Sequence, residues 1–315
     1  MTISRTSIVK GPAFVSFNSV VFFTEGDIQL DPILETFQLN SSLHGGNQDQ
    51  YLNDILLKVS FSPEGFWAYR SVLCPYHTPT LGQEIFGTTD KDVVIQTLAG
   101  KQLTLKAGAV TKMPDINLSA GKALWGGSVE LTCIGTNNTA WSNASKRMAI
   151  TDNAFSESTY ATDSKLIVPY TAAWGSSTPW DDIVCNEDGW TVSFELNVVP
   201  DKTDTEGTIG MSLESCKVMA KCTPKGIDED DLLTLLNIQG TGVARGAKLS
   251  ANKEDLIIQG ASTDDPKVTI FNATPKTAGF RFGTTTLRIG EVGFEGLAHI
   301  SAGANAQLFE LTVVS

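Results

Sequence analysis

Residues 217–226 read Lys217-Val-Met-Ala-Lys-Cys-Thr-Pro-Lys-Gly226, and Ile227-Asp-Glu-Asp-Asp-Leu-Leu-Thr-Leu-Leu236 follows directly. The first part alternates apolar and polar side chains, which is typical of a half-buried strand. Pro224 and Gly226 then end that strand in a sharp turn. The four acids that come next suit a helix N-terminus. Leu232, Leu233 and Leu236 have the spacing of one apolar helix face. The stretch therefore predicts a strand, a turn and a helix over 228–237.

A similar stretch occurs earlier in the chain. Lys58-Val-Ser-Phe-Ser-Pro-Glu-Gly65 is followed by Phe66-Trp-Ala-Tyr-Arg-Ser-Val-Leu73. Pro63 and Gly65 precede Pro224 and Gly226 by the same offset (224 − 63 = 226 − 65 = 161). A second helix is predicted over 64–73, and its packing residues are Trp67, Val72 and Leu73. We expect the two helices to pack equivalently, each on the sheet of its own half.

The strand patterns that follow the two turns also correspond. Asp92-Val-Val-Ile-Gln96 matches Asp255-Leu-Ile-Ile-Gln259 at a similar offset (255 − 92 = 163). Short strand-like runs with glycine turns follow in both halves, as all-β chains show. A common order at a nearly constant offset indicates a tandem duplication. Monotonous β patterns that align by chance are the alternative.

Composition restricts the class of protein. The chain has 315 residues, 41% hydrophobic and 18% charged, as expected of a folded globular protein of two domains. Its net charge of −12 argues against sequence-independent binding of nucleic acid, which depends on basic groups. No apolar run is long enough to span a membrane, and the N-terminus does not resemble a signal peptide. We expect the five scattered cysteines to be reduced thiols of a protein made in the cytoplasm.

The fold class predicted from these patterns is mainly β. Residues 1–134 are expected to form a first β-sandwich or barrel domain with an N-terminal arm, and 180–315 a second, each with one short flanking helix. Residues 135–179 are small and polar, and we interpret them as a connecting and decorating segment. Ser41–Asp49 is predicted to be a loop, and Trp190–Val198 is the clearest strand because it alternates without a break.

No catalytic, cofactor or metal site is predicted. His44, His77 and His299 are far apart in the sequence and lie beside no recognisable nucleophile turn. The acids Asp228–Asp231 lack the alternating spacing and the glycine of a calcium loop. An enzyme with a dispersed site is therefore the least favoured function, and the chain is interpreted as a non-enzyme without cofactors.

Three features together carry a resemblance to a known family. The Gly11-Pro-Ala-Phe-Val-Ser-Phe17 opening, the repeated Pro-x-Gly and helix unit, and Ala109-Val-Thr-Lys-Met-Pro114 resemble the tail tube proteins of long-tailed bacteriophages. The resemblance covers both halves but not residues 135–177. It implies a β-sandwich with one flanking helix, stacked in rings around a lumen that passes DNA, and no catalytic residues. Family members with two fused tube domains form trimeric rings with pseudo-sixfold symmetry.

This resemblance also implies the partners and the location. The partners would be further copies of the chain, tail proteins such as the tape measure and the terminator, and viral DNA passing without sequence-specific binding. There would be no membrane partner, and the protein would be made in the host cytoplasm and reside in the virion. A surface-binding module, such as an adhesin or a carbohydrate-binding fibre protein, is the alternative. It rests on the tryptophans between Asn137 and Trp190, since exposed aromatic rings can stack on sugars.

Overall fold

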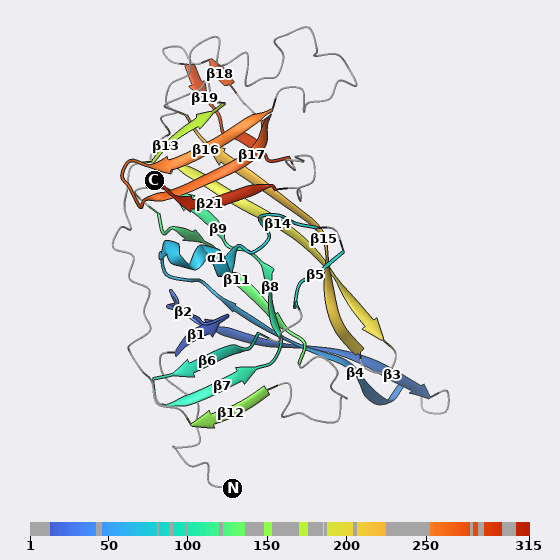
Figure 1. The fold of residues 1–315 in the computed structure, drawn as a ribbon. Helices are drawn as coiled ribbons and strands as arrows, with labels where there is room; N and C mark the ends of the chain where they lie inside the picture. Colours follow the sequence, from blue (N-terminus) through green and yellow to red (C-terminus); the bar gives the residue numbers. More distant parts are fainter. Residues whose placement is uncertain are drawn as a thin grey trace.

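The computed structural model describes residues 13–41, 46–80, 82–87, 91–98, 100–119, 122–135, 148–152, 170–175, 185, 188–203, 207–224, 253–277, 280–282, 287–297 and 307–315. Their fold is mainly β, with antiparallel strand pairing throughout (Figure 1). The helical structure within these ranges is the 3-10 turn η2 (Trp67–Tyr69) and the single turn α1 (Arg70–Leu73). The predicted fold class is confirmed as mainly β.

The first half of the chain forms twelve of the strands. They are β1 (Ala13–Phe17), β2 (Val20–Phe22), β3 (Gln29–Ser41), β4 (Gly46–Phe61), β5 (Gln83–Glu84), β6 (Val93–Thr97), β7 (Lys101–Leu105), β8 (Gly108–Lys112), β9 (Asp115–Leu118), β10 (Trp125–Gly126), β11 (Val129–Cys133) and β12 (Met148–Asp152). They build the sheets β12-β7-β6-β1-β2 and β3-β4-β11-β8, while β5, β9 and β10 join strands of the second half.

The second half begins at β13 and contributes most of a ten-stranded sheet. Its strands are β13 (Tyr170–Trp174), β14 (Trp190–Thr203), β15 (Gly207–Cys222), β16 (Glu254–Gly260), β17 (Pro266–Thr277), β18 (Phe280–Phe282), β19 (Leu287–Ile289), β20 (Val292–Glu295) and β21 (Phe309–Val313). The long sheet has the order β10-β9-β14-β15-β20-β17-β16-β13, with β21 and β5 paired to β17 and β15. Strands β18 and β19 form a separate two-stranded sheet.

Two long hairpins dominate the architecture, and they match in detail. Both ends of β15 follow those of β4 at the same offset (207 − 46 = 222 − 61 = 161). Each second strand has two extra residues at which the register shifts; these are Gln48 and Asn53 in β4, and Ile209 and Glu214 in β15. An extra residue bends a strand and increases its twist. The hairpins β3–β4 and β14–β15 therefore bend at corresponding places.

The strands beside the hairpins repeat the same neighbours. Strand β11 pairs with β4 and β8, and β20 pairs with β15 and β17. The extra residue Thr111 shifts the β8–β11 register, and Lys276 shifts the β17–β20 register at an offset of 165 (276 − 111 = 165). The order β3-β4-β11-β8 thus recurs as β14-β15-β20-β17.

The remaining strands recur as well. The order β1-β6-β7-β12 of the first half corresponds to β13-β16-β17-β21 of the second. Val93 pairs with Leu105, and Leu256 pairs with Ile270, so β6 and β16 keep the offset found in the sequence match (256 − 93 = 163). Strand β17 is long enough to occupy the positions of both β7 and β8. Because β17 is continuous, the strands of the second half belong to one sheet, whereas the corresponding strands of the first half belong to two.

The hydrophobic core runs through both halves without a break. One cluster of buried side chains extends from Val15 and Phe22 in the first half to Trp190 and Phe294 in the second. Trp190 lies on β14, with its ring 6.1 Å from that of Phe294. The predicted Trp190–Val198 strand is confirmed, and its buried and half-buried residues alternate from Trp190 to Phe194.

Several predicted boundaries differ from the structure. The helix expected over 64–73 begins only at Trp67 and is a 3-10 turn followed by one α-helical turn. The loop expected over 41–49 was predicted too long, because Ser41 ends β3 and Gly46 begins β4. The segment predicted as a connection, 135–179, contains β12 and β13, which extend sheets of the first and second half. The helix predicted over 228–237, with Leu232, Leu233 and Leu236, lies outside the described residues, as does Gly226.

Candidate functional site

Metal-ligating side chains do not cluster in the part of the chain that the structure describes. No group of three or more His, Cys, Asp or Glu residues there could hold a metal ion. His44 and His299 lie outside these ranges, and the His77 backbone carbonyl accepts a hydrogen bond from Leu308 N–H at 2.9 Å. The two halves of the chain are in contact through strand pairing and through side-chain hydrogen bonds. We treat this contact as the candidate site.

The centre of this contact is a strand pair. Strand β9 of the first half runs antiparallel to β14 of the second, with Leu118, Asn117 and Ile116 opposite Trp190, Thr191 and Val192. The Thr191 hydroxyl donates a hydrogen bond to Asn117 Oδ1 at 3.3 Å. Backbone pairing of this kind makes one sheet continuous across the two halves and closes an otherwise open strand edge.

Gly189 enters this pair at close range, and its substitution should be costly. It has φ +62°, and a Cβ added there would lie 2.4 Å from the Leu118 carbonyl oxygen, which is fixed in the β9 backbone. We expect Gly189→Ala to lower the free energy of unfolding by more than the ~1–2 kcal/mol of a left-handed conformation alone. Gly127→Ala is the matched control, because Gly127 has φ +74° and open space around its missing Cβ. Urea unfolding measures both; equal losses would contradict the close approach.

The short helix joins the halves at a second place. The Trp67 indole N–H donates to the Thr312 carbonyl at 2.8 Å, and Arg70 Nε donates to the Leu311 carbonyl at 3.2 Å. The guanidinium of Arg70 lies 5.5 Å from the centre of the Trp67 ring. Both acceptors are on β21, in the second half. The expectation for this helix named only the sheet of its own half; the structure adds donors that satisfy carbonyls on a strand of the other half.

The turn end of the second hairpin also touches the middle of the first. Asp54 on β4 is buried, and its Oδ2 accepts hydrogen bonds from the Thr208 backbone N–H, at 3.1 Å, and from the Thr208 hydroxyl. Lys202 Nζ lies 2.5 Å from Glu35 Oε2 on the surface nearby. The hydrogen bond to Glu35 raises the pKa of Lys202, which keeps the ammonium charged. Polar side chains thus fix β15 beside β4.

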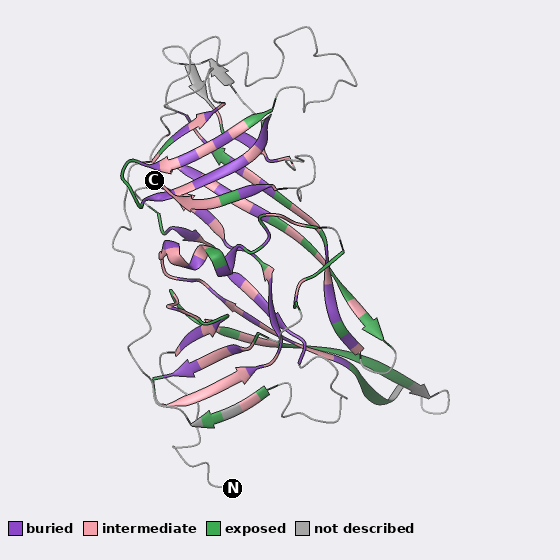
Figure 2. Ribbon diagram, in the orientation of Figure 1, coloured by how far each residue is buried: buried purple, intermediate pink, exposed green. Residues whose placement is uncertain are grey.

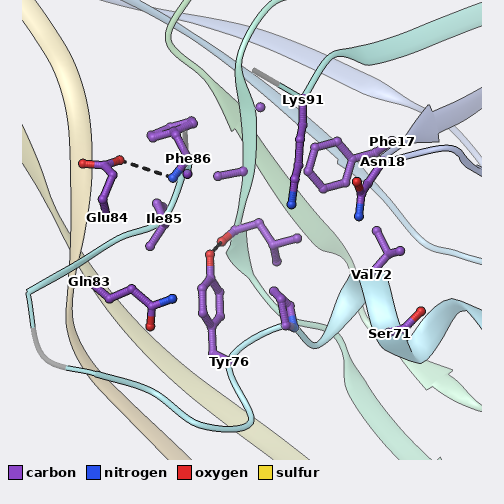
Figure 3. Close-up of a pocket in the computed structure, with 15 residues that line it drawn as sticks. Phe17, Asn18, Ser71, Val72, Tyr76, Gln83, Glu84, Ile85, Phe86 and Lys91 are labelled. Atoms are coloured by element: carbon purple, nitrogen blue, oxygen red, sulfur yellow. Dashed lines mark hydrogen bonds between the residues drawn. The ribbon is translucent and has the colours of Figure 1, made fainter. Parts of the chain in front are cut away.

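Strand β5 covers the other side of the second hairpin. Gln83 and Glu84 pair with Leu213 and Ser212 on β15. The Glu84 carboxylate accepts the N–H of Met211 at 3.2 Å and that of Phe86 at 3.2 Å (Figure 3). Leu213 is fully buried as a result. A loop of the first half therefore lies against the hairpin of the second half.

A cavity of about 240 Å³ lies between this loop, α1 and β8. Figure 3 shows Tyr76 pointing at the β8 backbone, where its hydroxyl donates to the Val110 carbonyl at 2.6 Å. Burial raises the pKa of Tyr76, so the phenol stays neutral. The lining contains no histidine or cysteine among the described residues, and its acid Glu84 is engaged with backbone N–H groups. All of its lining residues belong to the first half of the chain.

The first hairpin differs from the second in its exposure. Leu34 and Leu52 on β3–β4 are 54% and 50% exposed, and Figure 2 shows exposed residues along its distal part. The corresponding residues of β14–β15 are Leu196, which is half-buried, and Leu213, which is fully buried. Phe37 and Tyr51 on the other face of β3–β4 are also exposed. Exposed apolar side chains thus occur on both faces of this hairpin.

The two prolines of the predicted turns occupy corresponding positions. Pro63 forms an isolated antiparallel bridge with Thr24, and Pro224 forms one with Cys185, so both members of the bridge recur at one offset (224 − 63 = 185 − 24 = 161). Gly65 follows Pro63 in the turn before η2. Trp67, Val72 and Leu73 are buried, as helix packing residues should be. The sequence patterns did not indicate the strand pair β9–β14, which fixes the position of one half relative to the other.

All five cysteines are free thiols, as expected. Burial, and secondarily the charge of Asp92, raises the pKa of Cys133 to about 12. An unfolded thiol ionises near its ordinary pKa, so above that pH the unfolded state binds fewer protons than the folded state. The free energy of unfolding should therefore be constant below about pH 8 and decrease above about pH 9, by ~1.4 kcal/mol per pH unit for this group. Urea midpoints at pH 8 and pH 10 measure it, and Cys133→Ala should show the smaller decrease. An equal decrease in parent and variant would contradict the assignment.

The structure describes Trp174 and Trp190, two of the tryptophans on which the surface-binding alternative rests. Trp174 and Trp190 are buried in the core, where they cannot stack on a sugar at the surface. Trp141 and Trp180 lie outside the described residues.

No helix within the described ranges has both the length and the apolar character needed to cross a membrane. Neither a protein-family model nor a curated protein matches the chain.

Proposed function

We propose that the protein is a structural subunit that assembles with copies of itself into rings, and that the rings stack into a bacteriophage tail tube. The observation that carries the proposal is the recurrence of strand order, register and bulges in the two halves. Such recurrence is expected of a duplicated domain, and it supports repeats spanning residues 13–152 and 170–313. These limits divide the segment predicted as a connection, because β12 and β13 each extend a different sheet.

The contact between the repeats supports self-assembly. It is head-to-tail, since β9 of one repeat meets β14 of the next and neither strand pairs with its own counterpart. Head-to-tail contacts continue until a rotation closes them into a ring. Two repeats per chain would give a trimeric ring with pseudo-sixfold symmetry, as the resemblance to fused tail tube proteins implies.

The charge of the chain suits a conduit for DNA. The net charge of −12 would repel a polyanion from the walls of the lumen, so DNA would pass without adhering to them. The tape measure and the terminator of a phage tail would be the further protein partners, and the virion would be the final location. We propose no catalytic activity for the chain.

Negative-stain microscopy of the purified protein at increasing concentration tests this function. Rings with sixfold appearance that contain three chains, and tubes built from them, are the expected result. Mass photometry of the same samples counts the chains per ring. A protein that stays monomeric at millimolar concentration, or rings of six chains, would overturn the proposal.

A further inference from the structure

We propose that β18 of one copy adds to the edge of β3 in the next copy, antiparallel, with Phe282 opposite Gln29 and Arg281 opposite Leu30. This inference rests on the proposed self-assembly and names the surface that forms the ring. The partner is a second copy of this chain, and the contact repeats between chains what β9 and β14 form within one.

The first step is that β18 occupies the place of β9. Strand β9 follows β8 and pairs with β10, while β18 follows β17 and pairs with β19. The register shifts place β17 at an offset of 165 from β8, and the same offset relates Phe280 to Asp115, the first residue of β9 (280 − 115 = 165). On this correspondence Arg281 takes the position of Ile116, and Phe282 that of Asn117.

The second step is that β3 presents the edge that β14 uses. Gln29 pairs with Ser60 on β4, and Thr191 pairs with Lys221, the counterpart of Ser60 on β15 (221 − 60 = 161). Thr191 is therefore the counterpart of Gln29, and Val192 that of Leu30. In β14 this edge is filled by β9. In the described structure β3 pairs with β4 alone, so its outer edge at Gln29 and Leu30 has no strand beside it.

The third step is that one chain cannot satisfy both edges by itself. Figure 1 shows β18 and β19 at one end of the molecule, beyond β16 and β17, and β3 and β4 toward the opposite end. In this view β13, β16 and β17 lie between β18 and the first hairpin. Only another copy can bring a β18 to this β3.

The exposed leucines of the first hairpin give independent support. Leu213 is fully buried beside β5, with which β15 pairs, whereas its counterpart Leu52 is 50% exposed. A neighbouring copy seated on β3–β4 in the same way would cover Leu52 and Leu34. The apolar surface thus lies on the element that the proposed strand addition would join.

Disulfide trapping tests the register. Gln29→Cys with Phe282→Cys should give covalent oligomers on a non-reducing gel after mild oxidation, with the linked peptide identified by mass spectrometry. Asn117→Cys with Thr191→Cys is the matched positive control, which should close within one chain because these side chains are already in contact. Gln29→Cys with Arg281→Cys is the register control, since adjacent strand residues point to opposite faces. The parent chain with its native thiols is the blank.

Each result has a distinct meaning. Interchain linkage in the Gln29/Phe282 variant, at least tenfold above the Gln29/Arg281 variant, supports the pairing. Its absence while the Asn117/Thr191 link forms overturns the pairing, whether or not rings are seen by microscopy. A covalent series that ends at three chains also agrees with the proposed ring. A series that continues beyond three supports the strand pairing but contradicts the trimeric ring.

Discussion

Replacing Trp174 by alanine should lower the free energy of unfolding by about 3–5 kcal/mol, the range measured for large aromatic side chains in cores. Trp174 is 2% exposed on β13, and its ring centre lies 5.7 Å from that of Phe294. Its indole N–H donates to the Ala273 carbonyl at 2.9 Å, so the variant leaves both a cavity and an acceptor without this donor. Urea unfolding followed by circular dichroism measures the loss.

The control for this variant is Leu98→Ala, because Leu98 is 53% exposed and its truncation should change stability by less than ~0.5 kcal/mol. The experiment also tests the assignment of β13 to the second repeat. If Trp174→Ala costs no more than Leu98→Ala, then β13 does not pack on β16 and β20 as described.

Removing the carboxylate of Asp54 should have the second-largest effect, about 2–4 kcal/mol. The side chain is buried and accepts hydrogen bonds from the N–H and hydroxyl groups of Thr208 and from the Ile55 N–H. Asp54→Ala removes the acceptor of the two Thr208 donors, which costs ~1–3 kcal/mol for each buried group that water does not reach. Because Thr208 is on β15, the loss falls on the contact between the two halves of the chain.

Hydrogen exchange distinguishes this effect from general destabilisation. In Asp54→Ala the Thr208 amide should exchange faster, while amides of β16 and β17 should change only as far as global stability does. Asp54→Asn keeps one oxygen acceptor and should recover part of the loss. Asp49→Ala, at an exposed position of the same strand, is the matched control. Unchanged protection at Thr208 would show that Asp54 does not hold the hairpins together.

The sequence predicted local structure better than the relation between halves. The match of Asp92–Gln96 to Asp255–Gln259 identified β6 and β16, because strands buried on one face carry similar apolar patterns. The common spacing of Pro63 and Pro224 likewise predicted that they occupy corresponding turns. In contrast, β9 is four residues long, and nothing in its composition indicates that its partner lies more than seventy residues later. Its pairing with β14 is a tertiary contact without a periodic signal.

The contacts of the short helix and of residues 135–179 could not be predicted from the sequence, for related reasons. The helix over 64–73 was predicted from its likeness to the later turn and helix, which says nothing of a hydrogen bond from Trp67 to β21. The segment around β12 and β13 was interpreted as a connection because its neighbours are small and polar. Both segments nevertheless form strands, since β12 pairs with the edge of β7 and β13 with the edge of β16.

The β9–β14 pairing within one chain has a kinetic consequence. A junction that forms inside a molecule has an effective concentration set by the intervening chain, independent of how much protein is present. A junction between molecules depends on the concentration of free subunits and carries the translational and rotational entropy cost of association. A ring of three such chains would contain three junctions between molecules in place of six. Its assembly would need two bimolecular encounters in place of five, because the last junction closes within the assembly. Formation of the ring would still depend on the concentration of free subunits, but with fewer bimolecular steps.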